Sequence, residues 1–344
     1  MKIFYAIQAT GNGHISRAME LLPYLQKFGT VHIFLSGANS TLPLDAPIKY
    51  RSNGLSLFYT CKGSLNYWKT VRGVAPWRIL KEVRDLPVEK YDLVINDFEC
   101  ITSLACAQKK IPSVNFGHQA SFMSVNTPRP DKPSKAGEWI LKNYARATNY
   151  IGLHFESYDD FIFSPVIKTG ILQAQPRNDG YFTVYLPSYC DKQLLQYLQP
   201  LKDHRFEVFS RQTKTPVSIG HITLRPVHEK DFDRSLIGCE GIVCGAGFET
   251  PAEALYLQKK MIAIPIQGQY EQQCNAAALR RLGVKTLDKL DDDFTDTFNN
   301  WVSDPQCPAI SYQYSTEAII DILMFRCTQL RYALDIPYPD LIFN

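Results

Sequence analysis

The sequence predicts an α/β protein built from two doubly wound, parallel-sheet domains. Apolar, strand-like runs alternate with helical segments along the whole chain. A glycine-containing turn leads from a strand into a helix at residues 11–13 and again at residues 245–247. With 344 residues, 45% of them apolar, the chain is long enough for two cores.

The first domain is predicted over residues 1–165. Its strands are expected at residues 3–7, 31–35, 92–95, 113–116 and 150–154, and its clearest helices at residues 17–28 and 135–146. The polar, glycine-punctuated stretch that follows, residues 166–180, interrupts the alternation and predicts a linker.

The second domain is predicted over residues 181–314. Its strands are expected at residues 182–186, 206–209, 221–224, 241–244 and 261–266, with helices that begin near Asp191, Thr250 and Glu271. The tail, residues 315–344, has helical periodicity between residues 315 and 334 and forms a separate helical segment.

Composition excludes several classes of protein. The net charge of +3 is too small for a nucleic-acid binder, although residues 1–165 are basic, with 19 Lys and Arg against 13 Asp and Glu. Nine cysteines without a Cys-x-x-Cys pair favour a reducing compartment. The N-terminal apolar run is too short for a signal peptide, and no run approaches the ~18 residues of a membrane span. We therefore expect a cytoplasmic protein, soluble or peripheral to the membrane.

The turn formed by Gly245, Ala246 and Gly247 is a candidate phosphate site. It joins an apolar strand to a helix, and the first N–H groups of a helix have no intrahelical partner and carry the positive end of the macrodipole. Glycines let a phosphate approach these groups closely. The turn is therefore predicted to bind a diphosphate without a charged side chain.

Polar residues near this turn are candidate ligands for the rest of a nucleotide sugar. Glu253 lies one helical turn further on, where its carboxylate can bind the paired hydroxyls of a ribose, and Glu271, Gln272 and Asn275 begin the next helix. The alternative for Glu253 is a capping box, with Thr250 at the N-cap and Glu253 reaching back to it.

Three motifs carry a resemblance to a known family. They are Gly11-Asn-Gly-His14-x-x-Arg17-Ala, then Gly247-Phe-Glu-Thr-x-x-Glu253-Ala-Leu, then Pro265-x-x-Gly-Gln-x-Glu271-Gln-x-x-Asn275-Ala. Over residues 1–290 the chain resembles glycosyltransferases of GT-B fold, in particular the bacterial family of the peptidoglycan N-acetylglucosaminyltransferase and its diacylglycerol-glycosylating relatives. The resemblance implies two Rossmann-like domains that face a cleft, a C-terminal helix that crosses back to the first domain, and ribose recognition by Glu253.

His14 is the candidate catalytic base. It begins a helix directly after the first strand, beside Gly11 and Gly13, where open α/β sheets bind ligands. A neutral imidazole can take the proton of an acceptor hydroxyl near pH 7. The resemblance implies an acidic partner at the end of a strand, which is Asp97 here, with Glu99 as the substitute. A dinucleotide site is disfavoured, because Ser16 replaces the third glycine of that fingerprint.

Two further regions are candidates for the acceptor side. His118 and Gln119 follow a predicted strand and can line the cleft. Residues 67–84 mix aromatic side chains with five basic residues and can contact an anionic membrane surface, which would favour a lipid acceptor. The alternative is an ordinary amphipathic helix whose aromatic side chains enter the core.

These observations predict an inverting glycosyltransferase that uses a nucleotide sugar, with UDP as the expected nucleotide and an unidentified acceptor hydroxyl. Retaining enzymes of this fold often carry a Glu eight positions before the ribose-binding Glu, and that position is Gly245 here. Asp231-Phe-Asp233 resembles a metal motif of another fold but is interpreted as a solvated loop, and no bound metal is expected. The alternatives are a nucleotide-sugar epimerase and a catalytically silent nucleotide-sugar binding module.

Overall fold

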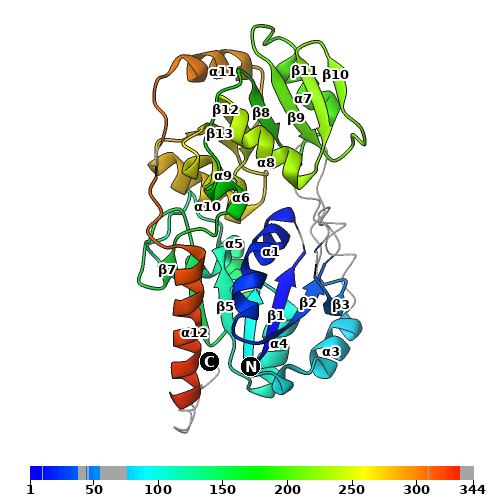
Figure 1. Ribbon diagram of the computed structural model, residues 1–344, viewed down its shortest axis with the longest axis vertical. Coiled ribbons are helices and arrows are strands. Elements are labelled where there is room, and N and C mark those ends of the chain that lie inside the picture. Colours follow the sequence, from blue (N-terminus) through cyan, green and yellow to red (C-terminus); the bar gives the residue numbers. More distant parts are fainter. Residues whose placement is uncertain (10, 38–43, 45, 55–75, 309, 334–344) are drawn as a thin grey trace.

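The computed structural model describes residues 1–9, 11–37, 44, 46–54, 76–308 and 310–333. It consists of two α/β halves, each with a seven-stranded sheet flanked by helices (Figure 1). The predicted fold class, two doubly wound domains of the GT-B type, is confirmed. Strands of the first sheet lie within residues 2–163 and those of the second within residues 182–286. The domain boundaries, with the linker at residues 166–180, stay a prediction.

The first sheet is parallel throughout, in the order β3-β2-β1-β4-β5-β6-β7. Its central strand β1 is buried except at its first residue, which explains why its sequence is an almost unbroken apolar run. The strands are β1 (Lys2–Gln8), β2 (Thr30–Ser36), β3 (Ile48–Ser52), β4 (Leu93–Asp97), β5 (Val114–Gly117), β6 (Asn149–Leu153) and β7 (Ile162–Phe163); the helices are α1 (Asn12–Gln26), α3 (Pro76–Asp85), α4 (Cys100–Lys109) and α5 (Lys135–Asn143), with short 3-10 helices η1 (Val88–Lys90) and η2 (His118–Met123).

The second sheet has the order β10-β11-β9-β8-β12-β13-β14, and only the β10–β11 pair is antiparallel. The strands are β8 (Phe182–Tyr185), β9 (Phe206–Ser210), β10 (Val217–Ile219), β11 (Ile222–Pro226), β12 (Gly241–Gly245), β13 (Lys260–Ile264) and β14 (Lys285–Thr286); the helices are α6 (Thr169–Leu172), which precedes the sheet, α7 (Asp191–Leu198), α8 (Glu229–Gly238), α9 (Glu249–Tyr256), α10 (Tyr270–Arg281) and α11 (Phe294–Ser303).

The order of strands reverses at one place in each sheet. In the first sheet β1 lies between β2 and β4, and in the second β8 lies between β9 and β12. Open α/β sheets bind ligands outside the carboxyl ends of their strands at such a reversal. The segments that follow β1 and β4, and those that follow β8 and β12, are therefore where a site is expected.

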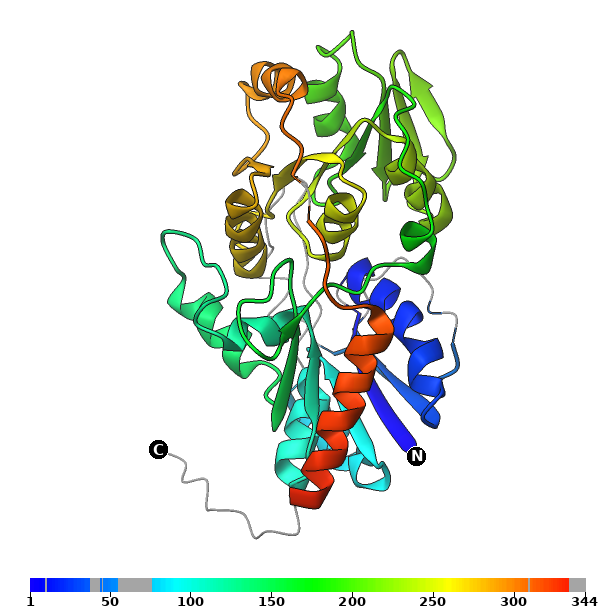
Figure 2. The ribbon, with the colours of Figure 1, turned by 60° about the vertical axis from the view of Figure 1, so that its left-hand side comes forward.

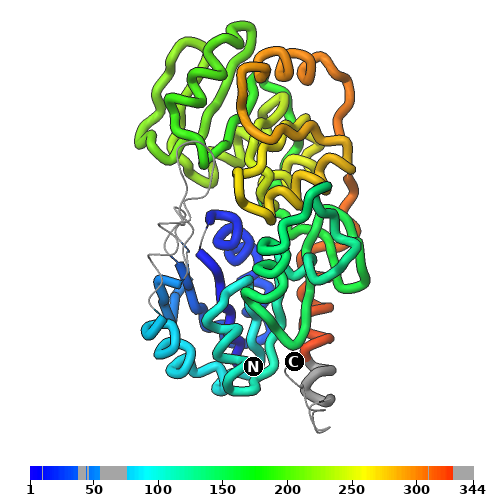
Figure 3. Tube along the Cα trace, turned by 180° about the vertical axis from the view of Figure 1, so that it is seen from behind, coloured from blue at the N-terminus to red at the C-terminus, as the bar shows by residue number. Residues whose placement is uncertain are grey.

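The C-terminal helix α12 (Thr316–Ala333) lies along the first half, as the resemblance implied (Figure 2). It contacts α1, where Lys27 Nζ donates to Glu317 Oε1 at 2.8 Å. On the face seen in Figure 3, α5 of the first half lies beside α10 of the second, and the Tyr270 hydroxyl donates to Glu138 Oε1 at 2.7 Å. Among the described residues, no helix is long and apolar enough to cross a membrane.

The structure corrects several details of the sequence prediction. All four strands that it misses, β3, β7, β10 and β14, are edge strands of two to five residues. An edge strand pairs on one side only, so it leaves a weak hydrophobic pattern. Helix α9 begins at Glu249 with Phe248 at its N-cap, one residue before the expected start at Thr250. Asp231 and Asp233 lie in helix α8, so the interpretation as a loop is wrong.

Candidate active site

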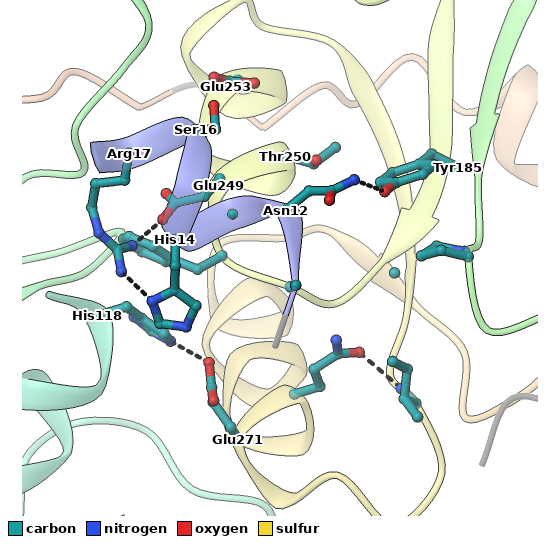
Figure 4. A pocket seen from close by; sticks show the side chains of 18 of the residues that line it. Asn12, His14, Ser16, Arg17, His118, Tyr185, Glu249, Thr250, Glu253 and Glu271 are labelled. Atoms are coloured by element: carbon teal, nitrogen blue, oxygen red, sulfur yellow. Dashed lines mark hydrogen bonds and ion pairs between the residues drawn. The ribbon is translucent and has the colours of Figure 1, made fainter. Parts of the chain in front are cut away.

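A cavity lies between the carboxyl ends of the two sheets, at the strand-order reversals (Figure 4). It brings together residues from distant parts of the sequence, as the prediction requires. The predicted site residues that line it are Gly11, Gly13, His14, His118, Gln119, Gly245, Gly247, Thr250, Glu253, Glu271 and Gln272.

His14 and Asp97 form a hydrogen-bonded pair at the reversal of the first sheet. Asp97 is the last residue of β4, beside β1 in the sheet, and His14 lies in the first turn of the helix that follows β1. His14 Nδ1 is 2.9 Å from Asp97 Oδ1. With Nδ1 occupied in this way, Nε2 is the nitrogen left for a ligand. Burial alone raises the pKa of Asp97, but Arg17 and His14 outweigh burial and hold that pKa below its ordinary value.

Arg17 is a site residue that the sequence prediction did not assign. It lies three residues after His14, on the same face of α1, and its Nη2 donates to both oxygens of Asp97 at 2.7 and 2.9 Å. The same nitrogen is 3.0 Å from His14 Nδ1. Nη1 donates to Glu249 Oε1 at the start of α9, so Arg17 joins the two halves of the protein. Its presence in the Gly-Asn-Gly-His-x-x-Arg motif was the available signal.

Glu99, the expected substitute for Asp97, has a different role. It is the N-cap of α4, where its carboxylate accepts from Ile101 N at 2.9 Å and Thr102 N at 2.6 Å. Both oxygens of Glu99 are therefore used for capping. Of the two acids, Asp97 is the one that the structure pairs with His14.

The glycine turn of the second half has open space beside it. A Cβ atom built on Gly247 would meet nothing within 4 Å, and one built on Gly245 would meet nothing closer than 3.9 Å. The N-cap of α9 makes no side-chain hydrogen bond. Ala246 differs from its neighbours, because it is buried outside the cavity lining and its N–H donates to Ile264 O at 3.1 Å. Gly245 and Gly247 are thus the members of the turn that line the cavity.

Glu253 does not cap α9, so the capping-box alternative is wrong. Its side chain is buried, and its Oε2 lies 3.3 Å from Nζ of Lys168, which also forms an ion pair with Asp233 of α8. Burial raises the pKa of Glu253 to about 8, although Lys168 acts in the opposite direction. Lys168 lies in the connection between the sheets and is a second cavity residue that the sequence prediction did not assign.

The residues at the start of α10 have three distinct placements. Gln272 Oε1 accepts from Ile266 N at 2.9 Å and supports the loop before the helix. Glu271 Oε1 accepts from Gln119 Nε2 at 3.0 Å, across the contact between the halves. Asn275 lies outside the cavity lining and is fully buried, with Oδ1 2.8 Å from His118 Nε2 and Nδ2 donating to Ala246 O. Asn275 therefore joins the halves.

His118 is buried at this contact. Its ring stacks on Phe248, with centroids 4.0 Å apart, and its Nδ1 is 3.0 Å from Leu153 O. Burial lowers the pKa of His118 below its ordinary value. Within the described residues, no group of three or more His, Cys, Asp or Glu side chains is arranged to hold a metal ion.

The basic, aromatic segment at residues 67–84 is described in part. Residues 67–75 lie outside the described residues, and residues 76–84 belong to α3. Trp77 is 84% exposed and Leu80 is 59% exposed, whereas Val83 is buried. The alternative that the aromatic side chains of this segment enter the core is therefore wrong for Trp77.

Two α/β halves of this topology, with a shared cavity at both strand-order reversals, define the GT-B fold. The chain belongs to glycosyl transferase family 1, whose family model matches residues 1–303. No curated protein matches the chain by sequence.

Solved structures of the same fold cover nearly the whole chain. The spinosyn forosaminyltransferase SpnP is 12% identical, with a TM-score of 0.57 over 95% of this chain and 99% of that one. A UDP-N-acetylglucosamine 2-epimerase is 12% identical, with a TM-score of 0.54 over 100% and 99%. The glycosyltransferase VinC in complex with DTDP is 12% identical, with a TM-score of 0.51 over 96% of each chain. At these identities the likeness shows the fold.

Proposed function

We propose that this glycosyltransferase inverts the anomeric centre of a nucleotide sugar and that His14 is its general base. The observation that carries the proposal is the His14–Asp97 pair, which faces the open glycine turn at residues 245–247 across one cavity. This arrangement supplies a base for an acceptor and an anion site for a leaving group within the same space.

The reaction forms a bond from the acceptor oxygen to the anomeric carbon and breaks the bond from that carbon to the diphosphate. His14 Nε2 takes the acceptor proton, while Asp97 holds Nδ1 and stabilises the imidazolium that forms. N–H groups at the start of α9 stabilise the charge that develops on the diphosphate. Gly245 stands where a retaining enzyme of the fold would carry its additional carboxylate.

The donor is proposed to lie along the second half of the cavity. Gly245 and Gly247 admit the diphosphate, with Gly11 and Gly13 opposite them. Thr250, Glu253, Glu271 and Gln272 are the polar side chains available to ribose and sugar hydroxyls, while Ala246 and Asn275 support the turn from behind. No divalent ion is assigned a role in this proposal.

UDP is the proposed nucleotide, on the resemblance to the peptidoglycan N-acetylglucosaminyltransferase family. Calorimetric titration with UDP, GDP and TDP, with and without magnesium, tests it. Metal-independent binding of UDP alone is the expected result. Selective binding of TDP would replace UDP, and no binding of any of the three would remove the donor site.

The acceptor side is proposed to be the first half, with His118 and Gln119 at its edge. The exposed Trp77 and Leu80, with Arg78 and Lys81 on the same helix, fit contact with an anionic membrane surface. We propose on these grounds a cytoplasmic protein that contacts the membrane surface. Co-sedimentation with anionic vesicles should be lost in Trp77→Ser, while neutral vesicles should bind neither protein.

The epimerase of the same fold makes a second activity worth testing. An epimerase changes a UDP sugar without an acceptor, whereas the proposed transferase consumes the donor only by transfer or slow hydrolysis. Incubation of a UDP-N-acetylglucosamine solution with the protein alone, followed by analysis of the sugar, separates these outcomes. A silent binding module would bind the nucleotide and leave the sugar unchanged in every assay.

A further inference from the structure

A continuous series of ion pairs connects His14 to the second half of the protein. His14 Nδ1 contacts Asp97, and Asp97 is held at both oxygens by Arg17. Arg17 in turn contacts Glu249 (Figure 4). The first three residues belong to the first half, and Glu249 is the first residue of α9 in the second. The side chains of Arg17, Asp97 and Glu249 are 2%, 0% and 13% exposed, so water screens these charges weakly.

The contact between α1 and α9 depends on a small residue. A Cβ atom built on Gly13 would lie 3.0 Å from Glu249 Cγ, so the glycine leaves the space that the Glu249 side chain occupies. In the part of the chain that the structure describes, Glu249 Oε2 is buried without a hydrogen-bond partner. In that part the carboxylate is therefore held by the contact of Oε1 with Arg17 and by packing against Gly13.

We propose that Glu249, acting through Arg17, is a positioning residue that sets the charge and the orientation of the His14–Asp97 pair. The base is then fully assembled only where α9, the proposed donor helix, lies against α1. This inference rests on the proposed function in one respect, the role of His14 as the base.

The charges of the cluster explain the effect. With Glu249 in place, two carboxylates share the guanidinium of Arg17, and the cluster beside a neutral His14 carries one net negative charge. Without Glu249, Arg17 compensates Asp97 fully, and the imidazolium that forms on proton uptake loses a stabilising charge. Burial raises the pKa of Glu249, and Arg17 is the principal opposing influence, so the carboxylate charge depends on this contact.

The other titratable groups near the cluster do not replace Glu249. Tyr5 of β1 is buried, which raises its pKa well above the ordinary value and keeps the phenol neutral. Glu271 of α10 is held by Gln119, and burial lowers the pKa of His118 behind it. After Asp97 and Arg17, which contact His14 directly, Glu249 is therefore the charge whose removal should affect His14 most.

The test is histidine NMR of the ligand-free protein, which needs no knowledge of donor or acceptor. Nitrogen-15 labelling of the histidine rings, with His14 assigned from His14→Gln, gives the tautomer and the midpoint of the His14 titration. In Glu249→Gln we expect that midpoint to fall by about half a pH unit or more. Glu20→Gln is the matched control. It neutralises an acid on α1, the helix that carries His14 and Arg17, but Glu20 contacts Thr169 and not Arg17.

A second variant separates position from charge. Gly13→Ala keeps every charge but places a methyl group 3.0 Å from Glu249 Cγ, so the Glu249 side chain must shift by a few tenths of an ångström relative to Arg17. The His14 midpoint should then fall as in Glu249→Gln, by a smaller amount. Equal midpoints in Glu249→Gln and Glu20→Gln, with both proteins folded, would overturn the inference. The proposed function fails by a different result, which is full turnover in His14→Ala.

Discussion

The two strand-order reversals that face the cavity differ in which parts of the chain they present to it. At the first, between β1 and β4, side chains act: His14, Asp97 and Arg17 are fixed by hydrogen bonds to one another. At the second, between β8 and β12, the cavity lining includes Gly245 and Gly247, which have open space beside them. A base must be oriented by a partner, whereas a diphosphate needs backbone N–H groups and room.

The largest expected effect comes from removal of the base at the first reversal. His14→Ala should lower turnover by about 10²- to 10⁴-fold and leave UDP affinity within about twofold, because the base acts on the acceptor proton. Release of UDP from the donor and calorimetric titration measure the two quantities. His221→Gln, at a histidine that contacts Leu198 O, is the control. Unchanged turnover in His14→Ala would remove His14 from the mechanism.

Asp97→Asn should lower turnover by about 10²-fold, since the amide no longer fixes the tautomer of His14 or stabilises its charged form. Glu99→Gln should instead cost about 1 kcal/mol of stability through the cap of α4, with turnover retained in the folded protein. Turnover and thermal unfolding of the two variants distinguish these roles. Equal losses of turnover would contradict the assignment of Asp97.

At the second reversal, Gly247→Ala should weaken UDP binding about tenfold without lowering Tm. The methyl group meets no protein atom within 4 Å, so it should not disturb the fold, and it would occupy space at the proposed diphosphate site. Gly170→Ala, also without a neighbour within 4 Å but outside the cavity lining, should bind UDP normally. Normal binding by Gly247→Ala would mean that the diphosphate lies elsewhere.

The last prediction concerns stability and Glu253. Its pKa of about 8 in the folded protein exceeds the ~4.3 of an unfolded chain, so the folded protein holds an extra proton between these values and loses stability as pH rises. Glu253→Gln should remove this loss and raise Tm at pH 8, relative to pH 5, by about 5 °C. The exposed Glu317→Gln should show no such change. Parallel Tm profiles for wild type and Glu253→Gln would show that Lys168 keeps Glu253 ionised throughout.

Sequence analysis identified the elements that depend on local pattern. The interior strands β1 and β12 are buried at all but one residue each, so their apolar runs are clear, and the turns after them are marked by glycines. The edge strands carry no such pattern. The same limit explains the error at Thr250, whose neighbours match a capping box locally although Glu253 is drawn to Lys168, 85 positions away in the sequence.

The sequence predicts the site residues whose place follows from a single strand end or motif. It does not predict the contact that joins residues of two separate motifs. His14 follows from its place after β1, and Asp97 from its place at the end of β4. Arg17 and Glu249 both stand in quoted motifs, but their contact spans 232 positions and depends on how the halves meet. Asn275 stands in the motif that predicts donor binding, yet in the structure its side chain is hydrogen-bonded to His118.

The chain passes between the two sheets twice, once after β7 and once before α12 (Figure 2). A body attached at one point can swivel in any direction, whereas a body attached at two points turns about the line that joins them. The crossing of α12 back to α1 therefore favours hinge rotation over free swivelling in any opening of the cavity. A single angle then describes how far the glycine turn stands from the histidine.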